Sequence, residues 1–284
     1  MLRGVVGAAL LALGRRLADV LAPPGCVGCG RLLAAGGTLT GALPLCDACR
    51  RRFARERALA AVVGDRGRLP IAAACVYGPV ARALVARFKF AGGHALAPPL
   101  ASAMLPAVRE LTTVLRSDGA RSGMDVRCAL TPVPTHPWRK RARGYDQAEL
   151  LARSLADIAG LPALDLLRRR GPLRPQRRRG RRDRLALPGD VFVVRRPPPP
   201  LALLLVDDVA TTGATLSAAA ATLAARGALL AGAVVFARAV RSRDRTASLG
   251  ELASRRTLAP SRRASTIAFE GTHSETGGPG CGSR

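Results

Sequence analysis

Two adjacent carboxylates followed by a threonine- and glycine-rich turn form the stretch of the sequence best suited to chemistry. Residues 203–215 read LLLVDDVATTGAT, so four apolar residues precede Asp207 and Asp208, and the turn 210–213 follows. Backbone N–H groups in such a turn, threonine hydroxyls and the dipole of a following helix form a cradle for one phosphate. The carboxylates suit the vicinal hydroxyls of a ribose and can help to position a metal ion. A ribose 5-phosphate is the simplest ligand, and an ordinary strand–turn–helix with an acidic cap is the alternative.

The residues on either side of the acidic pair predict the elements that position it. The apolar run from Leu203 predicts a buried parallel strand, and the alanine- and leucine-rich segment Ala214–Ala225 predicts a helix. The turn between them would lie where open α/β sheets bind ligands. Further strands are predicted at Ile71–Tyr77, Val126–Val133, Leu164–Arg170, Val191–Val194 and Leu229–Ala237. Further helices are predicted at Val80–Phe90, Leu96–Val108 and Ala148–Ile158, with a surface linker at Arg116–Asp125 and a loop at Thr135–Gln147. We therefore predict an α/β domain over residues 69–240, with a parallel sheet and helices on both faces.

Four of the seven cysteines form two CxxC pairs with the spacing of a zinc ribbon. They are Cys26, Cys29, Cys46 and Cys49, and they predict a small zinc ribbon over residues 23–60. Four protein ligands leave no open position for water, so the zinc would be structural. A redox-active dithiol is the alternative. Paired metal-binding cysteines favour a reducing compartment, which predicts a cytoplasmic protein.

The two ends of the chain carry different patterns. Apolar residues at helical spacing in 1–22 predict an amphipathic helix, and a secretory signal is the alternative. Residues 241–284 are rich in serine, arginine and glycine, which predicts a disordered tail. No apolar run in the sequence approaches the roughly 18–20 residues of a membrane-spanning helix.

The formal charge of +26 favours a polyanionic partner such as nucleic acid, although the bias toward arginine can also reflect genome composition. Two basic stretches could contact single-stranded DNA, and the first of them also carries the aromatic rings of Trp138 and Tyr145. The candidate residues are Trp138, Arg139, Lys140, Arg141, Tyr145, Arg177, Arg178 and Arg179. In Phe88–Lys89–Phe90 the aromatic rings could stack on bases or lie in the core. The basic segment Arg50–Arg57 is either a solvated helix face or an interaction surface.

The stretch 203–215 closely resembles the binding signature of type I phosphoribosyltransferases, which use 5-phosphoribosyl 1-pyrophosphate (PRPP) with Mg²⁺. The resemblance implies that Asp207 and Asp208 hold the ribose hydroxyls and that Arg143 and Gly144 bind pyrophosphate, with Asp207, Asp208 and Arg143 as the catalytic residues. It assigns the 5-phosphate to Ala210, Thr211, Thr212, Gly213, Ala214 and Thr215. It also places a flexible catalytic loop at 171–188.

Two further features narrow the resemblance. Residues 143–151 read RGYDQAELL, and together with the cysteine module they resemble the ComF family of DNA-uptake and competence proteins, over roughly residues 18–240. The family usually has asparagine where this chain has Asp146. The resemblance implies a protein that binds PRPP and Mg²⁺, contacts single-stranded DNA and acts with DNA-uptake proteins. An active phosphoribosyltransferase of nucleobase salvage is the alternative.

Overall fold

The computed structural model describes residues 25–33, 42–58, 69–90, 93–121, 127–170 and 191–239. Three sequence predictions lie outside these residues: the helix at 1–22, the arginine-rich loop at 171–188 and the tail at 241–284.

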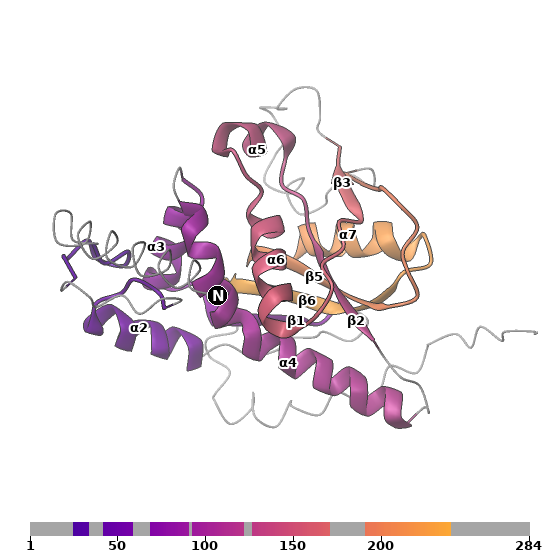
Figure 1. The fold of residues 1–284 in the computed structure, drawn as a ribbon, viewed down its shortest axis with the longest axis horizontal. Helices are drawn as coiled ribbons and strands as arrows, with labels where there is room; N and C mark the ends of the chain where they lie inside the picture. The colour runs from indigo at the N-terminus through magenta and orange to yellow at the C-terminus, as the bar shows by residue number, and fades with distance from the viewer. Residues whose placement is uncertain are drawn as a thin grey trace, which may run out of the picture.

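A four-stranded parallel sheet forms the centre of the fold (Figure 1). Its strands are β1 (Ile71–Val76), β2 (Cys128–Pro132), β5 (Ala202–Ala210) and β6 (Leu229–Arg238), in the spatial order β1-β6-β5-β2. Leu205 of β5 lies level with Thr131 of β2 and with Ala233 of β6. The structure confirms the prediction of an α/β fold built on a parallel sheet.

Helices cover both faces of this sheet. They are α2 (Asp47–Ala58), α3 (Pro79–Phe88), α4 (Ala97–Arg121), α5 (Pro137–Arg143), α6 (Gln147–Ala159) and α7 (Ala214–Ala224), with a 3-10 turn η1 (Gly93–Leu96). α4 and α6 pack against one face, and α7 packs against the other. Within the described ranges, no helix combines the length and apolar character needed to span a bilayer.

Strand β5 is apolar on both sides because each side faces a separate core. Leu204 and Val206 are buried with α4 and α6, whereas Leu203 and Leu205 are buried with α7. Successive side chains of a strand point to opposite faces, so an unbroken apolar run satisfies both cores at once.

Three local predictions were wrong. The segment 164–170 does not form a strand of the parallel sheet. Only an isolated parallel bridge links Ala163 to Leu130 of β2, with the N–H of Leu164 donating to the carbonyl oxygen of Leu130, after which β3 (Leu167–Arg169) pairs antiparallel with β4 (Phe192–Val194) in a separate two-stranded sheet. Leu167 is buried while Arg168 is exposed, so the segment has one apolar side and cannot serve as a strand buried on both faces. The predicted linker at 116–125 begins as helix, since α4 continues to Arg121.

The predicted loop 135–147 contains the short helix α5. Pro137 occupies its first turn, and the His136 side chain accepts a hydrogen bond from the backbone N–H of Trp138 at 3.4 Å. A proline at that position and a capping acceptor before it favour a helix start, even in a strongly basic segment.

The chain leaves the neighbouring strands β2 and β5 toward opposite faces of the sheet. After β2 it forms α6 on one face, and after β5 it forms α7 on the other. Connections that diverge in this way leave a crevice beyond the carboxyl ends of the two strands, where open α/β sheets bind ligands. Residues 133–146 follow the end of β2, and residues 211–213 follow the end of β5.

Candidate ligand site and metal centre

A cavity of about 130 Å³ occupies this crevice and joins residues from α5, α6, α7, β3 and β5 and from the connections after α3, β2 and α5. Among its lining residues are Asp207, Asp208, Arg143 and Thr215, which the sequence predicted to act together. The sequence alone did not assign the other lining residues to a shared site. These are Lys89, Val133, Pro134, Thr135, Arg139, Asp146, Gln147, Ala148 and Arg169.

Asp208 forms an ion pair with Lys89 inside this cavity. Lys89 follows α3, and its Nζ lies 2.6 Å from Oδ2 of Asp208, whose residue is 9% exposed. A carboxylate this buried needs a charged or hydrogen-bonding partner, and Lys89 supplies it. The sequence showed Lys89 between two aromatic residues and did not predict a role for it in this site. In the structure, Phe88 is buried in the core and Phe90 is exposed.

Asp207 points to the opposite side of β5 from Asp208. Its Oδ1 accepts a hydrogen bond from the backbone N–H of Asp208 at 2.8 Å. Burial in the cleft and repulsion from Asp208 raise the pKa of Asp207 well above its ordinary value. Arg169 faces this carboxylate, and burial together with repulsion from Arg139 lowers the pKa of Arg169. The cleft therefore holds an acidic pair that is only partly neutralised.

The turn after β5 leads into the start of α7, and Thr215 is the residue of this region that lines the cavity. Gly213 adopts φ 76° and precedes the first residue of α7, and a side chain there would be strained. The backbone N–H of Ala214 donates to Oγ1 of Thr212 at 3.3 Å. Thr211 and Thr212 are exposed, and Thr215 lines the cavity. The turn therefore exposes two hydroxyl groups to solvent, and α7 places a third in the wall of the cavity.

Arg143 and Gly144 end α5 at the rim of the cavity. Gly144 adopts φ 84° and caps the helix, with its N–H donating to the carbonyl oxygen of Lys140. The Arg143 guanidinium donates to Oε1 of Gln147 at 2.8 Å. Nε2 of Gln147 is buried and has no hydrogen-bond partner within the described part of the chain. Gln147 thus leaves one buried donor in the wall of the cavity.

Asp146 has a structural role as the N-cap of α6. Its Oδ1 accepts hydrogen bonds from the N–H groups of Ala148 and Glu149 at 3.1 and 3.4 Å, and its Oδ2 accepts one from Thr135 at 2.9 Å. Burial raises the pKa of this carboxyl, although these hydrogen bonds oppose the shift. Asparagine could accept the two bonds to Oδ1, but its Nδ2 could not accept the bond from the N–H of Thr135, so the aspartate keeps the cap and adds this third bond.

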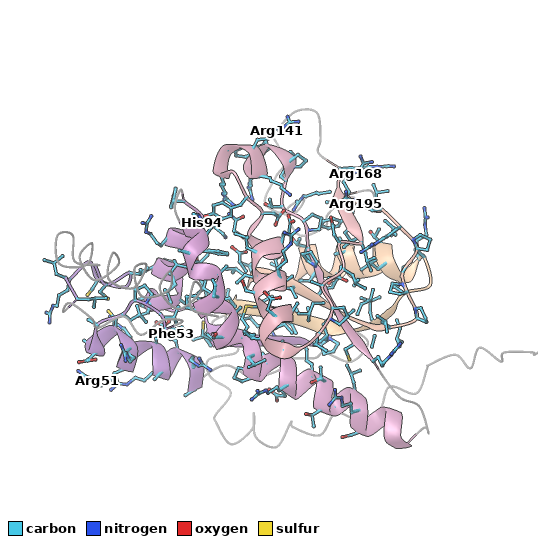
Figure 2. All side chains as sticks on the ribbon, viewed as in Figure 1. Arg51, Phe53, His94, Arg141, Arg168 and Arg195 are labelled. Atoms are coloured by element: carbon cyan, nitrogen blue, oxygen red, sulfur yellow. The ribbon has the colours of Figure 1, made fainter. Side chains whose placement is uncertain are left out.

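Helix α5 presents its side chains to solvent, and none of its residues is buried. Trp138 is 57% exposed, and the Arg139 guanidinium lies 5.6 Å from the centre of its ring. Lys140 pairs with Glu149 at 2.9 Å, and Arg141 lies at the outer end of the molecule in Figure 2. The predicted partners Arg177, Arg178 and Arg179 lie outside the described residues.

Tyr145 is tied to the end of α3. Its hydroxyl lies 2.5 Å from the carbonyl oxygen of Phe88 and 2.8 Å from that of Phe90, and it donates its proton between them. Its ring also contacts Phe88 and His94. The hydroxyl is therefore engaged within the protein.

The four predicted zinc ligands converge, with their Sγ atoms all within 4.8 Å of one another. The Sγ atoms of Cys29 and Cys46 are 3.7 Å apart, close to the roughly 3.8 Å that a tetrahedron of zinc–sulfur bonds requires. The N–H of Cys46 donates to Sγ of Cys26 at 3.2 Å. A Cβ at Gly28 would lie 2.8 Å from Sγ of Cys49, so glycine keeps room for the cluster. These residues fit a tetrahedral metal ion such as Zn²⁺.

The electrostatics of the cluster also suit a cation. Burial tends to raise the pKa of Cys26, but backbone hydrogen bonds at Cys46, Cys29 and Gly28 outweigh it and lower the pKa to about 6. Burial and the neighbouring thiols raise the pKa of Cys49 to about 12. A divalent ion would remove the repulsion between the thiolates.

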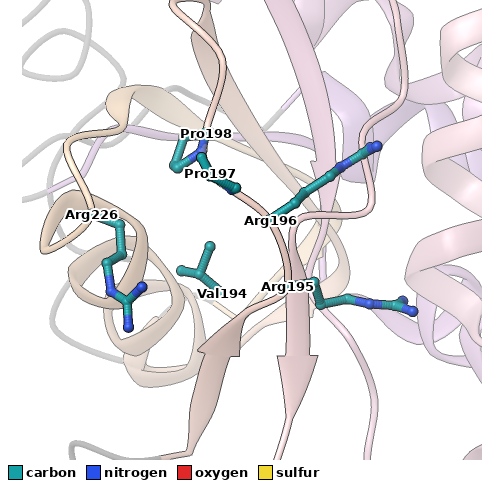
Figure 3. Close-up of a pocket in the computed structure, with 6 residues that line it drawn as sticks. All are labelled: Val194, Arg195, Arg196, Pro197, Pro198 and Arg226. Carbon is teal, nitrogen blue, oxygen red and sulfur yellow. The ribbon is translucent and has the colours of Figure 1, made fainter.

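A second, larger hollow of about 340 Å³ lies away from the carboxylates (Figure 3). It is lined by Val194, Arg195, Arg196, Pro197, Pro198 and Arg226. The side chains of Arg195 and Arg196 point away from Val194 and Arg226 in Figure 3, and Arg195 pairs with Asp165. Its lining residues include no carboxylate or hydroxyl group, in contrast to those of the smaller cavity.

Comparison with known proteins adds no assignment: the chain matches no family model, and a search of the curated proteins finds no match.

The cysteine cluster predicts that metal removal will unfold the N-terminal module. We expect purified protein to contain one zinc ion per chain and Cys49→Ser to lose it, with a fall in Tm of roughly 10 °C or more, because structural zinc contributes directly to folding. Elemental analysis and thermal denaturation provide the measurements. Cys128→Ser, which alters a buried cysteine of β2 outside the cluster, should retain the metal. Full zinc content in Cys49→Ser would contradict the assignment.

The raised pKa of Asp207 predicts a pH-dependent effect of Asp207→Asn. The folded state binds this proton more readily than the unfolded state, so stability is lost as the pH rises through the raised pKa. Asparagine carries no charge, and at pH 8 the variant should melt roughly 2–4 °C above wild type, the shift that about 1 kcal/mol produces in a chain of this size. At pH 5 the difference should shrink. Asp157→Asn, at an exposed position on α6, should show neither effect, and an Asp207→Asn variant that melts below wild type at pH 8 would refute the argument.

Proposed function

We propose that this chain is a ComF-like protein of the phosphoribosyltransferase fold, which binds PRPP with Mg²⁺ in the cleft beyond β2 and β5 and acts in DNA uptake or utilisation. One observation carries the proposal. A single cavity joins an adjacent pair of carboxylates, the start of α7 and four basic side chains. A ligand with vicinal hydroxyls at its centre and phosphate groups at both ends satisfies all three sets of groups. Inorganic phosphate alone would leave the carboxylates without a partner.

Each part of the cleft has a role in this proposal. Asp207 and Asp208 accept hydrogen bonds from the ribose hydroxyls, and the turn before α7 donates backbone N–H groups to the 5-phosphate. Arg143, Arg139 and Arg169 line the side of the cavity formed by α5 and β3, where they neutralise the pyrophosphate. Mg²⁺ bound by pyrophosphate oxygens and a carboxylate would reduce the charge on the leaving group.

The alternative function is transfer of the phosphoribosyl group to a nucleobase. The bond between C1 of the ribose and the pyrophosphate oxygen would break, and its electron pair would leave with pyrophosphate. A base nitrogen would bond to C1 and lose its proton to the departing pyrophosphate or to water. The three arginines favour this step because they lie where negative charge develops. Release of pyrophosphate in the presence of a nucleobase distinguishes turnover from binding alone.

We also propose that α5 contacts single-stranded DNA. The helix buries none of its side chains, and it presents Trp138, Arg139 and Arg141 to solvent. An exposed ring beside guanidinium groups can stack on a base while the charges contact phosphates. An association with DNA-uptake proteins belongs to the same proposal and follows from the family resemblance. The proposed cytoplasmic location follows from the paired metal-binding cysteines, which favour a reducing compartment.

The ligand proposal predicts that PRPP binds to wild type with Mg²⁺ and that Asp207→Ala/Asp208→Ala abolishes binding, since the ribose hydroxyls lose both acceptors. Titration calorimetry measures this directly. Asp157→Ala removes an exposed carboxylate from α6 and should bind as wild type does. Absence of binding by folded wild-type protein at millimolar PRPP would overturn the proposed function.

The DNA proposal predicts salt-sensitive binding of a short oligonucleotide. The logarithm of the affinity should fall linearly with the logarithm of the salt concentration, and Arg141→Ala should reduce the slope by roughly 0.7 for each phosphate that is no longer neutralised. Trp138→Ala should weaken binding without changing the slope, because stacking releases no counterions. Arg109→Ala on α4 is the matched control, since it removes an exposed arginine far from α5. Affinity that is independent of salt would exclude this surface as a DNA-binding site.

A further inference from the structure

Helix α3 connects the metal module to the ligand site. Its N-terminus contacts α2, which follows directly from the cysteine cluster, and its C-terminus leads to Lys89 in the cleft. At about 1.5 Å per residue, a helix of this length spans roughly 15 Å as a rigid element.

The N-terminus of α3 is capped by a side chain from α2. Oε1 and Oε2 of Glu56 accept hydrogen bonds from the N–H groups of Val80 and Ala81 at 3.0 and 2.9 Å. Gly78, the N-cap residue of α3, has no side chain to do this. A Cβ at Gly78 would lie 2.4 Å from Oε1 of Glu56, so glycine leaves space for the carboxylate. Glu56 is 5% exposed, and the N–H groups and dipole of α3 compensate its buried charge.

The same face of α2 carries a metal ligand, a core contact and this cap. Cys49, Phe53 and Glu56 are four and three residues apart, which places them on one side of a helix. The ring of Phe53 stacks on Phe236 of β6, with centroids 6.0 Å apart and an angle of 19° between the planes. Figure 2 shows Phe53 on the side of α2 toward the sheet and Arg51 on the other side. The cluster, the sheet and α3 are thus joined through one helix.

The C-terminus of α3 is held by the ligand site. Lys89, directly after the helix, places its Nζ 2.6 Å from Asp208, and the Tyr145 hydroxyl bridges the carbonyl oxygens of Phe88 and Phe90. A shift of α3 along its axis would therefore move Lys89 away from Asp208.

We infer that Glu56 is a positioning residue of the ligand site, which holds α3 so that Lys89 reaches Asp208 and thereby couples metal binding at the cysteines to the charge state of the cleft. The consequence for PRPP rests on the proposed function. With Lys89 withdrawn, the acidic pair is less neutralised and repels a ligand rich in phosphate. The interaction between Lys89 and Asp208 itself can be tested without PRPP.

The chain contains only two lysines, Lys89 and Lys140, which makes amine labelling a direct test. Their side chains are 32% and 52% exposed, so Lys140 serves as an internal reference on the same molecule. Acetic anhydride at limiting concentration, followed by mass spectrometry, gives the ratio of labelling at the two positions. We expect Lys89 to react more slowly than Lys140 in the metal-loaded wild type.

Glu56→Gln should raise the Lys89:Lys140 ratio on the order of fivefold, the effect of losing one helix cap. Gln retains one acceptor oxygen but sets an amide N–H₂ against the second backbone donor. Removing the metal from wild type with a chelator should raise the ratio in the same direction. Glu110→Gln, which neutralises an exposed carboxylate on α4, should leave the ratio unchanged.

An unchanged ratio in folded Glu56→Gln would overturn the inference. If Glu56→Gln unfolds, both lysines react alike, and the milder Glu56→Asp takes its place. This variant keeps the charge but shortens the side chain. An unchanged labelling ratio in Glu56→Asp would also overturn the inference. PRPP titration of the same variants separates the two proposals. Wild type that fails to bind PRPP but shows the shift in labelling would refute the proposed function alone, whereas wild type that binds PRPP without the shift would refute the coupling alone.

Discussion

The burial of β5 on both faces constrains every polar group in the cleft. Between its neighbours β2 and β6, the strand has no side that reaches solvent until it nears its carboxyl end. Asp207 and Asp208 occupy that end, where the helices no longer cover both sides. Two or three residues earlier, a carboxylate would fall within the segment 203–206, where every residue is fully buried. It could not keep its charge there. The site is therefore polar at the only part of this strand that can be polar.

Charge balance within the cleft follows from this placement. Asp208 forms an ion pair with Lys89, whereas burial and the neighbouring charge of Asp208 raise the pKa of Asp207. Four basic side chains and three acidic ones line the cavity. The basic side chains favour a ligand that carries negatively charged groups in addition to hydroxyl groups. Separate parts of the chain supply these charges: Lys89 directly follows α3, Arg139 and Arg143 belong to α5, and Arg169 belongs to β3. The geometry of the site consequently depends on how those elements pack.

The metal module is part of that packing. Phe53 reaches the central sheet and Glu56 caps a core helix, so the module shares the larger core with α3, α4 and β6. The basic residues of α2 that face solvent, such as Arg51, lie on the opposite side of the same helix. The sequence predicted that Arg50–Arg57 is either a solvated helix face or an interaction surface. Neither prediction included a buried side of α2, because arginines dominate the composition of this segment.

The sequence by itself determined the parallel sheet, the cysteine cluster and the acidic pair before the threonine-glycine turn. Each depends on local pattern: an apolar run for β5, the spacing of two CxxC pairs, and small residues where a strand turns into a helix. Only the tertiary structure placed Lys89, Arg169 and Glu56, because their partners lie far from them in the chain, as Lys89 lies 119 positions before Asp208. It also decided that the segment around β3 leaves the main sheet, since a short strand with one apolar side can be stabilised in either arrangement until its neighbours are known. Local patterns follow from steric and hydrophobic preferences along the chain, whereas the pairing of charges across a cleft depends on the topology that brings the strand ends together.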